Sequence, residues 1–279
     1  MPVALVTDST AYLSEEAAAR HGVDVVPLSV VMGDEDLEEG VAVTPGDVAA
    51  ALRARIQVTT SRPSPEAFAA AYRAMAARGA TGIVSMHLSA ELSGTYEAAL
   101  LAAEDAPVPV RVLDTRMVAM ALGYPVLTAA AVAQAGGSLD EVVAAAEKRA
   151  AGTTGFFYVD TLEYLRRGGR IGAARAMLGS ALAVKPLLHL ADGRIQPLEK
   201  VRTSSRAIAR LEEIAIAQAG AAEVDLAVHH LAAEAAALTL AERLRERIPG
   251  LGELYVGEVG AVIGAHVGPG LLAVVVSPR

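Results

Sequence analysis

Residues 3–31, VALVTDSTAYLSEEAAARHGVDVVPLSVV, contain the alternation that decides the fold. Val3–Thr7 is a continuous apolar run of the kind that forms a buried strand. A helix should follow, with Ser14 as its N-cap, glutamates in its first turn and a basic end closed by Gly22. Residues Val23–Val31 then predict a second strand. Strand, helix and strand in this order indicate a parallel sheet flanked by helices.

The same alternation continues along the chain and then restarts. Extended segments are expected at Val58–Ser61, Thr81–His87 and Val108–Leu113, and a helix start follows each of the first two. The β pattern resumes at Thr153–Val159, so we place a lobe boundary near residue 152. The predicted fold class is α/β, with an N-terminal lobe over 1–152 that has a parallel sheet flanked by helices, and a C-terminal α/β lobe over 153–279.

Composition narrows the classes of function. The net charge of −8 argues against a general nucleic-acid binder, which normally presents a basic face. Only 4% of the residues are aromatic and none is Trp, while 53% are hydrophobic, so a cavity would have aliphatic walls suited to an alkyl chain. The absence of Cys excludes disulfides and thiolate chemistry, and no cluster of ligand residues in the sequence indicates a metal site.

One uncharged stretch, Met117–Leu139, is long enough to span a bilayer. It is rich in Ala and contains Pro125 and a Gly-Gly pair, so a buried helix is favoured over a membrane segment. The first ten residues carry no basic region ahead of the apolar ones, so no signal peptide is recognised and a cytoplasmic location is expected.

Two hydroxyl-rich segments, Thr59–Ser64 and Ser89–Thr95, each follow an extended segment and precede a helix. In an open α/β sheet that position is the carboxyl edge, where ligands bind, and helix N-termini there favour a small anion. The alternative is simple helix capping, because Ser, Thr and Pro are the expected residues at any helix start. Their equivalent places on one predicted sheet keep both interpretations open.

His266 and a run of arginines are further candidates. His266 lies in a glycine-rich segment, 264–270, that predicts a loop, where a histidine could donate to an anion, act as a base or make a structural hydrogen bond. Arg166, Arg167 and Arg170, with Arg202 further on, predict either a docking surface for phosphate or an acidic partner, or a solvated basic turn.

Several motifs together resemble the DegV family, in order from residue 3 to the C-terminus. They are Val6–Thr10, the Thr-Thr-Ser-x-Pro-Ser-Pro run from Thr59, Leu92–Tyr96, Leu162–Ile171, Lys185-Pro186 and Gly264–Gly270. The resemblance implies two α/β lobes with a long-chain fatty acid buried between them and no other cofactor. It also implies the fatty-acid-binding subunit of a bacterial fatty acid kinase, not an enzyme by itself. A separate ATP-using subunit would phosphorylate the carboxylate to an acyl phosphate for phospholipid synthesis.

The resemblance assigns roles to individual positions. Ser61 and Ser93 match the residues that bind the fatty-acid carboxylate, and Thr60, Thr95 and His266 match residues close to the head group. The C-terminal lobe would contribute the acyl-chain cavity and an arginine-rich surface. The residues that match or adjoin the surface expected to meet the kinase are Arg166, Arg167, Arg170 and Arg202. Arg62 departs from the family motif, which often has Gln there, and could add charge beside the head group or face solvent.

Two rival functions remain at this point. A stand-alone hydrolase or acyltransferase would use Ser93 with His266, and needs Ser93 Oγ within hydrogen-bond reach of a histidine that a carboxylate orients. A lipid sensor without a kinase partner is the other.

Overall fold

The computed structural model describes residues 2–177 and 185–279, which form two compact units. Unit 1 consists of the residues up to Ser29 together with Ser61–Gly152, and unit 2 consists of Val30–Thr60 together with Thr153–Arg279. The lobe predicted over 1–152 is therefore wrong in one part, because residues 30–60 fold with the second unit. Contacts such as the hydrogen bond from the Val262 amide to the Glu39 carboxylate, 2.8 Å long, explain this difference.

Unit 1 is built on the predicted parallel sheet, which has the strand order β2-β1-β6-β7. Its carboxyl ends meet at one edge, as parallel strands require. The strands are β1 (Val3–Asp8), β2 (Val23–Val26), β6 (Gly82–His87) and β7 (Val110–Asp114).

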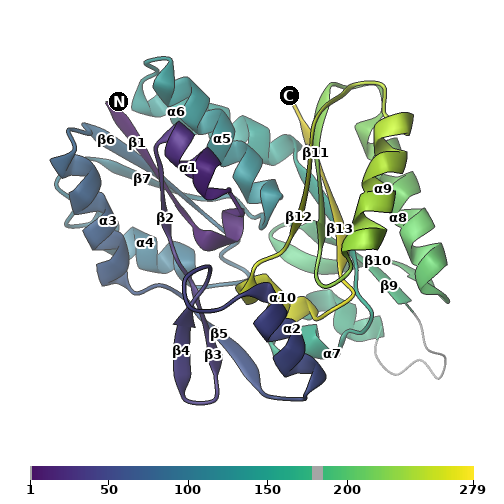
Figure 1. The fold of residues 1–279 in the computed structure, drawn as a ribbon. Helices are drawn as coiled ribbons and strands as arrows, with labels where there is room; N and C mark the ends of the chain where they lie inside the picture. Colours follow the sequence, from purple (N-terminus) through teal and green to yellow (C-terminus); the bar gives the residue numbers. More distant parts are fainter. Residues whose placement is uncertain (1, 178–184) are drawn as a thin grey trace. The chain divides into compact units, whose positions relative to one another are not determined.

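Helices flank this sheet on both faces (Figure 1). They are α1 (Glu15–His21), α3 (Pro65–Ala77), α4 (Thr95–Ala103), α5 (Met120–Gln134) and α6 (Leu139–Gly152), with a 3-10 turn at Ser9–Ala11. Helix α1 begins and ends as predicted, because the Ser14 hydroxyl accepts from the Ala17 amide and Gly22 adopts a left-handed φ of 63°. Phe68 and Tyr72 of α3 are fully buried in the core between α3, α4 and the sheet.

The strand predicted over Val23–Val31 is two strands in two different sheets. Pro27 has no N–H to give to a sheet, and the Leu28 amide donates to the Ser9 hydroxyl instead, at 3.0 Å. The second piece is β3 (Ser29–Met32), which joins β4 (Glu35–Glu38) and β5 (Val58–Ser61) in a three-stranded sheet of order β4-β3-β5.

Strand β5 carries Thr60 and Ser61, so these residues are not at the edge of the parallel sheet. Ser93, in contrast, follows β6 of that sheet. The expectation that the two hydroxyl-rich segments occupy equivalent places on one sheet is therefore wrong. Its cause is the break at Pro27, which diverts the chain into β3 and the elements that follow.

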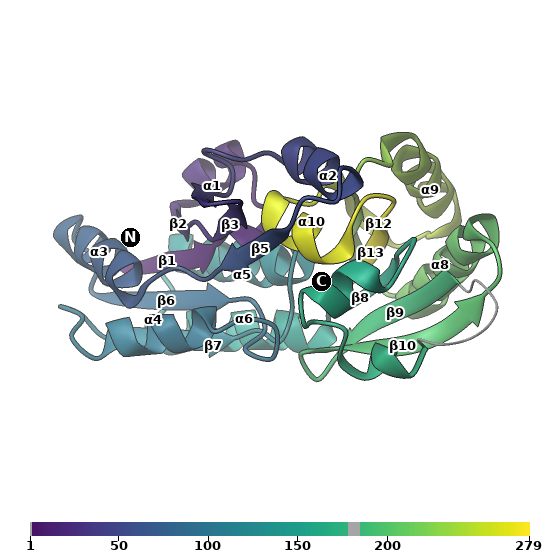
Figure 2. The same ribbon diagram turned by 90° about the horizontal axis from the view of Figure 1, so that it is seen from below.

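Unit 2 has a six-stranded sheet of order β10-β9-β8-β13-β11-β12, in which only the β11–β12 pair is parallel among the described strands. Helices α8 (Ser204–Ala219) and α9 (Glu234–Arg247) pack against it over an aliphatic core (Figure 2). The strands are β8 (Thr154–Tyr158), β9 (Lys185–Ala191), β10 (Arg194–Val201), β11 (Val224–His230), β12 (Leu251–Glu258) and β13 (Leu272–Pro278).

Shorter helices complete unit 2. They are α2 (Pro45–Arg53), α7 (Glu163–Arg167), a 3-10 turn at Gly172–Met177 and α10 (Ala261–Val267). His266 therefore lies on a helix, and the predicted glycine-rich loop is wrong over this part. The glycines have a packing role: a Cβ on Gly264 would lie 3.3 Å from Leu231, and Gly268 ends the helix with a positive φ of 73°.

The uncharged stretch folds as predicted, as α5 with most of its side chains buried. Within the described residues, no helix combines the length and the apolar character that crossing a membrane demands.

Candidate functional site

In unit 2 the structure pairs two of the predicted site residues, Thr60 and His266. Thr60 Oγ1 lies 2.9 Å from His266 Nε2. Burial, and secondly the charge of Arg170, lowers the pKa of His266 to about 4, so the imidazole is neutral at pH 7. Its Nδ1 is also buried and has no hydrogen-bond partner among the residues that the structure describes.

The turn after α7 fixes the position of this imidazole. A Cβ on Gly168 would lie only 2.1 Å from His266 Nδ1, so no larger residue fits there without moving the ring. The Arg170 guanidinium donates to the Gly168 carbonyl at 2.6 Å, which brings its charge close to His266. Gly168 and Arg170 thus belong to the surroundings of the Thr60–His266 pair.

In unit 1 the hydroxyls of Ser93 and Thr95 form a second pair, with 2.9 Å between Oγ and Oγ1. Thr95 is fully buried and Ser93 is half-buried. The N-cap of α4 is Gly94, and no side chain caps this helix start. Helix capping therefore does not account for Ser93.

Arg62 connects the two predicted segments within unit 1. Its guanidinium donates to the Gly94 carbonyl at 2.9 Å, and a Cβ on Gly94 would lie 2.3 Å from Arg62 Nη1. The chain beside Ser61 therefore reaches the turn that carries Ser93. Capping of the following helix is performed by Ser64, whose hydroxyl accepts from the Ala67 amide, and not by Ser61.

A fully buried polar network lies beneath this turn. The Tyr72 hydroxyl donates to Ser85 Oγ at 2.9 Å, Ser85 Oγ is 2.7 Å from His87 Nε2, and His87 Nδ1 is 3.1 Å from Asp8 Oδ2. A carboxylate only accepts, so His87 Nδ1 carries the proton toward Asp8, which leaves Nε2 to accept from Ser85. The Tyr72 hydroxyl also lies 3.3 Å from the Ala99 carbonyl, so the network is anchored to the backbone at the Tyr72 end as well.

Asp8 links this network to the segment that leads to Ser93. Besides His87, its carboxylate accepts from the Leu88 amide at 2.9 Å, and from the amide and hydroxyl of Thr10. Leu88 begins the segment that leads to Ser93. From the sequence, Asp8 has no predicted role and His87 is only the last residue of an expected extended segment. One feature of the sequence could have predicted the role of Asp8: it is a carboxylate at the end of an apolar strand. A charge that is buried in this way requires hydrogen-bond partners.

The four arginines predicted as a docking surface fall into different environments. Arg166 and Arg167 are exposed and both pair with Glu163, at 2.8 and 2.7 Å. These hydrogen bonds lower the pKa of Glu163 to about 2. Arg202 is exposed just after β10, whereas Arg170 is half-buried beside His266.

Comparison with known proteins places this site in context. The family described as "Uncharacterised protein, DegV family" matches residues 2–279. The chain belongs to the DegV family. A DegV domain-containing protein of Streptomyces coelicolor is 68% identical over 277 residues, which cover 99% of each chain. Protein DegV of Bacillus subtilis is 34% identical over 280 residues, with 98% of each chain covered.

Solved DegV structures have the same fold. A DegV family protein from Thermus thermophilus, described as binding fatty acid, superposes with a TM-score of 0.94 at 36% identity over 100% of both chains. DegV from Bacillus subtilis, described as a fatty acid binding protein, gives a TM-score of 0.91 at 32% identity, again over 100% of both chains. The two-unit α/β architecture predicted from the sequence is thus the DegV fold.

Proposed function

We propose that this DegV protein binds a long-chain fatty acid and presents its carboxylate to a separate ATP-dependent kinase. The observation that carries the first part is the full-length similarity, with a TM-score of 0.94, to a DegV structure described as binding fatty acid. The second part rests on the family resemblance of the sequence and on the exposed arginine Arg202.

The carboxylate would be bound by hydroxyl donors, with Ser61 and Ser93 as its main ligands. In the Ser93–Thr95 pair one hydroxyl proton is used between the two oxygens, and the other remains free to donate to a ligand. Thr60 and His266 would contribute from the second hydrogen-bonded pair. The guanidinium groups of Arg62 and Arg170, which lie next to these two pairs, favour an anion over a neutral head group.

The tail would supply most of the affinity. Burial of an alkyl chain gains about 0.8 kcal/mol per CH₂, so a long chain outweighs a few hydrogen bonds at the head group. We assign the acyl-chain cavity to the C-terminal part of the protein, residues 153–279. The polar site then fixes which end of the fatty acid is available for phosphorylation.

The stand-alone hydrolase is not favoured by the contacts of Ser93 and His266. The Ser93 hydroxyl pairs with Thr95, and His266 Nε2 pairs with Thr60. A catalytic histidine also needs a carboxylate on its other nitrogen, yet His266 Nδ1 has no hydrogen-bond partner in the described part of the chain. An assay with the kinase separates the proposed carrier from a lipid sensor, which would need no such partner.

The ligand is tested by native mass spectrometry of the purified protein before and after delipidation and reloading with palmitate. We expect one bound C14–C18 fatty acid per chain. A matched pair of variants locates the head group: Ser93→Ala should weaken binding, whereas Ser205→Ala, which removes an exposed hydroxyl at the start of α8, should not. A protein that stays empty after lipid feeding would refute the carrier.

The kinase step is tested by acyl-phosphate formation with the cognate ATP-using subunit. Arg202→Glu reverses an exposed charge and should reduce turnover while fatty-acid binding stays unchanged. Arg73→Glu, an exposed arginine on α3, serves as the control. Full turnover of Arg202→Glu would exclude Arg202 from the docking surface, and no turnover of the wild type with any fatty acid kinase would favour the lipid sensor.

A further inference from the structure

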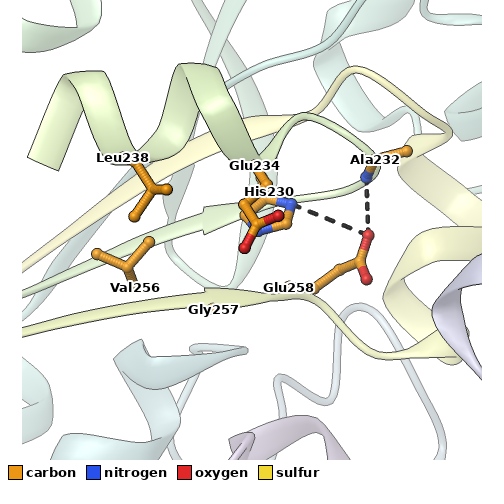
Figure 3. Close-up of a pocket in the computed structure, with 7 residues that line it drawn as sticks. All are labelled: His230, Ala232, Glu234, Leu238, Val256, Gly257 and Glu258. Atoms are coloured by element: carbon orange, nitrogen blue, oxygen red, sulfur yellow. Dashed lines mark hydrogen bonds and ion pairs between the residues drawn. The ribbon is translucent and has the colours of Figure 1, made fainter.

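A recess lies in unit 2, at the carboxyl ends of the parallel strands β11 and β12 and the start of α9 (Figure 3). Its volume of about 520 Å³ falls in the range of small-molecule sites. The residues that line it are His230, Ala232, Glu234, Leu238, Val256, Gly257 and Glu258.

His230 is the buried polar group of this recess. It is the last residue of β11, stands opposite Glu258 in the strand register, and is 7% exposed. Its Nδ1 has no hydrogen-bond partner among the described residues. The Glu258 carboxylate oxygen is 3.9 Å away, which is too far for a hydrogen bond. A buried ring nitrogen without a partner costs free energy, and a ligand that supplies the partner would remove that cost.

Two carboxylates share the recess with His230. The Glu258 carboxylate accepts a hydrogen bond from the Ala232 amide at 2.8 Å. Ala232 adopts a φ of 51°, in the left-handed region that non-glycine residues rarely occupy. Glu234 is the first residue of α9. Neither Lys nor Arg is among the seven described residues that line the recess. No side chain of these two types there balances the negative charges of Glu234 and Glu258.

Charge and shape together select the ligand. Carboxylates only accept hydrogen bonds, so the complement of Glu234 and Glu258 is a cation with several N–H groups. Leu238 and Val256 add an apolar wall for an aliphatic stem. We propose that this recess binds an organic cation, an alkylammonium or alkylguanidinium.

Two other ligand classes fit less well. A metal ion needs more ligands, and the described residues contain no group of three His, Cys, Asp or Glu that could hold one. A fatty-acid carboxylate would be repelled by Glu234 and Glu258. The recess is therefore chemically distinct from the proposed head-group site, and its occupancy does not depend on the fatty-acid function.

Isothermal titration calorimetry with agmatine, a guanidinium on a four-carbon stem with a terminal amine, tests the proposal. The expected result is saturable binding of one agmatine per chain. Pentanoate, an anion with a similar stem, should not bind. Glu234→Gln and Glu258→Gln keep the shape of the recess and remove one charge each, so each should weaken agmatine binding by about tenfold. Glu246→Gln, an exposed glutamate further along α9, is the control and should bind as the wild type does.

The source of the cation is distinguished by a third probe, N-acetyl-arginine amide, which presents the same guanidinium as a protein side chain does. Equal affinity for this probe supports the site with a partner's arginine as its ligand, and binding of agmatine alone supports it with a free amine. The proposal is overturned if agmatine shows no saturable binding at millimolar concentration. It is equally overturned if both Gln variants bind agmatine as tightly as the wild type.

Discussion

Replacement of Asp8 by Asn should destabilise the protein by about 3 kcal/mol. The wild-type carboxylate accepts four hydrogen bonds, two from the amide and hydroxyl of Thr10 and two from His87 Nδ1 and the Leu88 amide. An Asn side chain accepts with one oxygen only, so its NH₂ group must face one of these two pairs of donors.

The less costly orientation turns the NH₂ group toward Thr10, because the Thr10 hydroxyl can rotate and accept. The Thr10 amide then loses its partner, which costs about 1–3 kcal/mol for a buried donor. The bonds to His87 and Leu88 change from charge-assisted to neutral, which removes about 1 kcal/mol from each. Relief of the desolvation penalty of a buried charge offsets part of this sum, so we place the total near its lower end.

Urea denaturation followed by circular dichroism measures this free energy of unfolding. Asp105→Asn, at an exposed position after α4, should change it by less than about 0.5 kcal/mol. Because Leu88 begins the Ser93 segment, Asp8→Asn should also weaken palmitate binding in buffer without urea, where the variant is still folded. A loss of stability below about 1 kcal/mol would refute the proposed role of the network.

Four further predictions concern the candidate site and the pH dependence of stability. Gly168→Ala should displace the His266 ring and weaken fatty-acid binding at least about fivefold in a displacement assay, because the new Cβ would lie 2.1 Å from Nδ1. Arg62→Glu should weaken the same binding by about tenfold, since it replaces the positive charge next to Gly94 with a negative one.

Burial lowers the pKa of both His229 and His266 from 6.5 to about 4, whereas in the unfolded chain they take up protons near pH 6.5. The unfolded state then binds more protons between these values, so the free energy of unfolding should decrease as the pH falls from 6.5 to about 4. A bound carboxylate should raise the pKa of His266 in an NMR titration with palmitate.

Controls and contrary outcomes for these predictions are direct. Gly46→Ala, where the nearest atom to a new Cβ is 3.6 Å away, should leave binding unchanged. Wild-type affinity of Gly168→Ala or Arg62→Glu would remove these residues from the site. A free energy of unfolding that is constant over the stated pH range would contradict the low pKa values of His229 and His266. An unchanged pKa of His266 with palmitate bound would place the carboxylate elsewhere.

Much of the fold followed from local sequence because the signals are local. The strands of the parallel sheet in unit 1 and the cap at Ser14 each depend on a few neighbouring residues. The assignment of residues 30–60 failed because it depends on contacts with α10, more than 200 positions away, such as the bond between Glu39 and Val262. No periodicity within one segment records such a contact.

In the candidate site, too, contacts between residues close in the sequence could be predicted, and contacts between distant residues could not. Ser93 and Thr95 are two positions apart, so their pairing was within reach of the sequence, whereas the contact of Arg62 with Gly94 spans 32 residues. The helical position of His266 is not predicted, because Gly264 and Gly268 favour a loop when only the sequence is considered. In the structure Gly264 allows close packing with Leu231 and Val48, and that reason becomes visible only once these side chains are placed.

The discontinuous make-up of unit 2 has a consequence for biosynthesis. Residues 30–60 leave the ribosome early, yet their partners Val262 and His266 lie 223 and 206 positions beyond Glu39 and Thr60. All four strands of the parallel sheet of unit 1 are present once residue 114 has emerged, whereas helix α2 and the side chains of Glu39 and Thr60 must wait for α10, near the end of the chain. Contacts of such long sequence separation close slowly. Throughout that interval the nascent protein carries an unfinished segment whose apolar residues, Val43 and Val48 among them, offer chaperones a natural target.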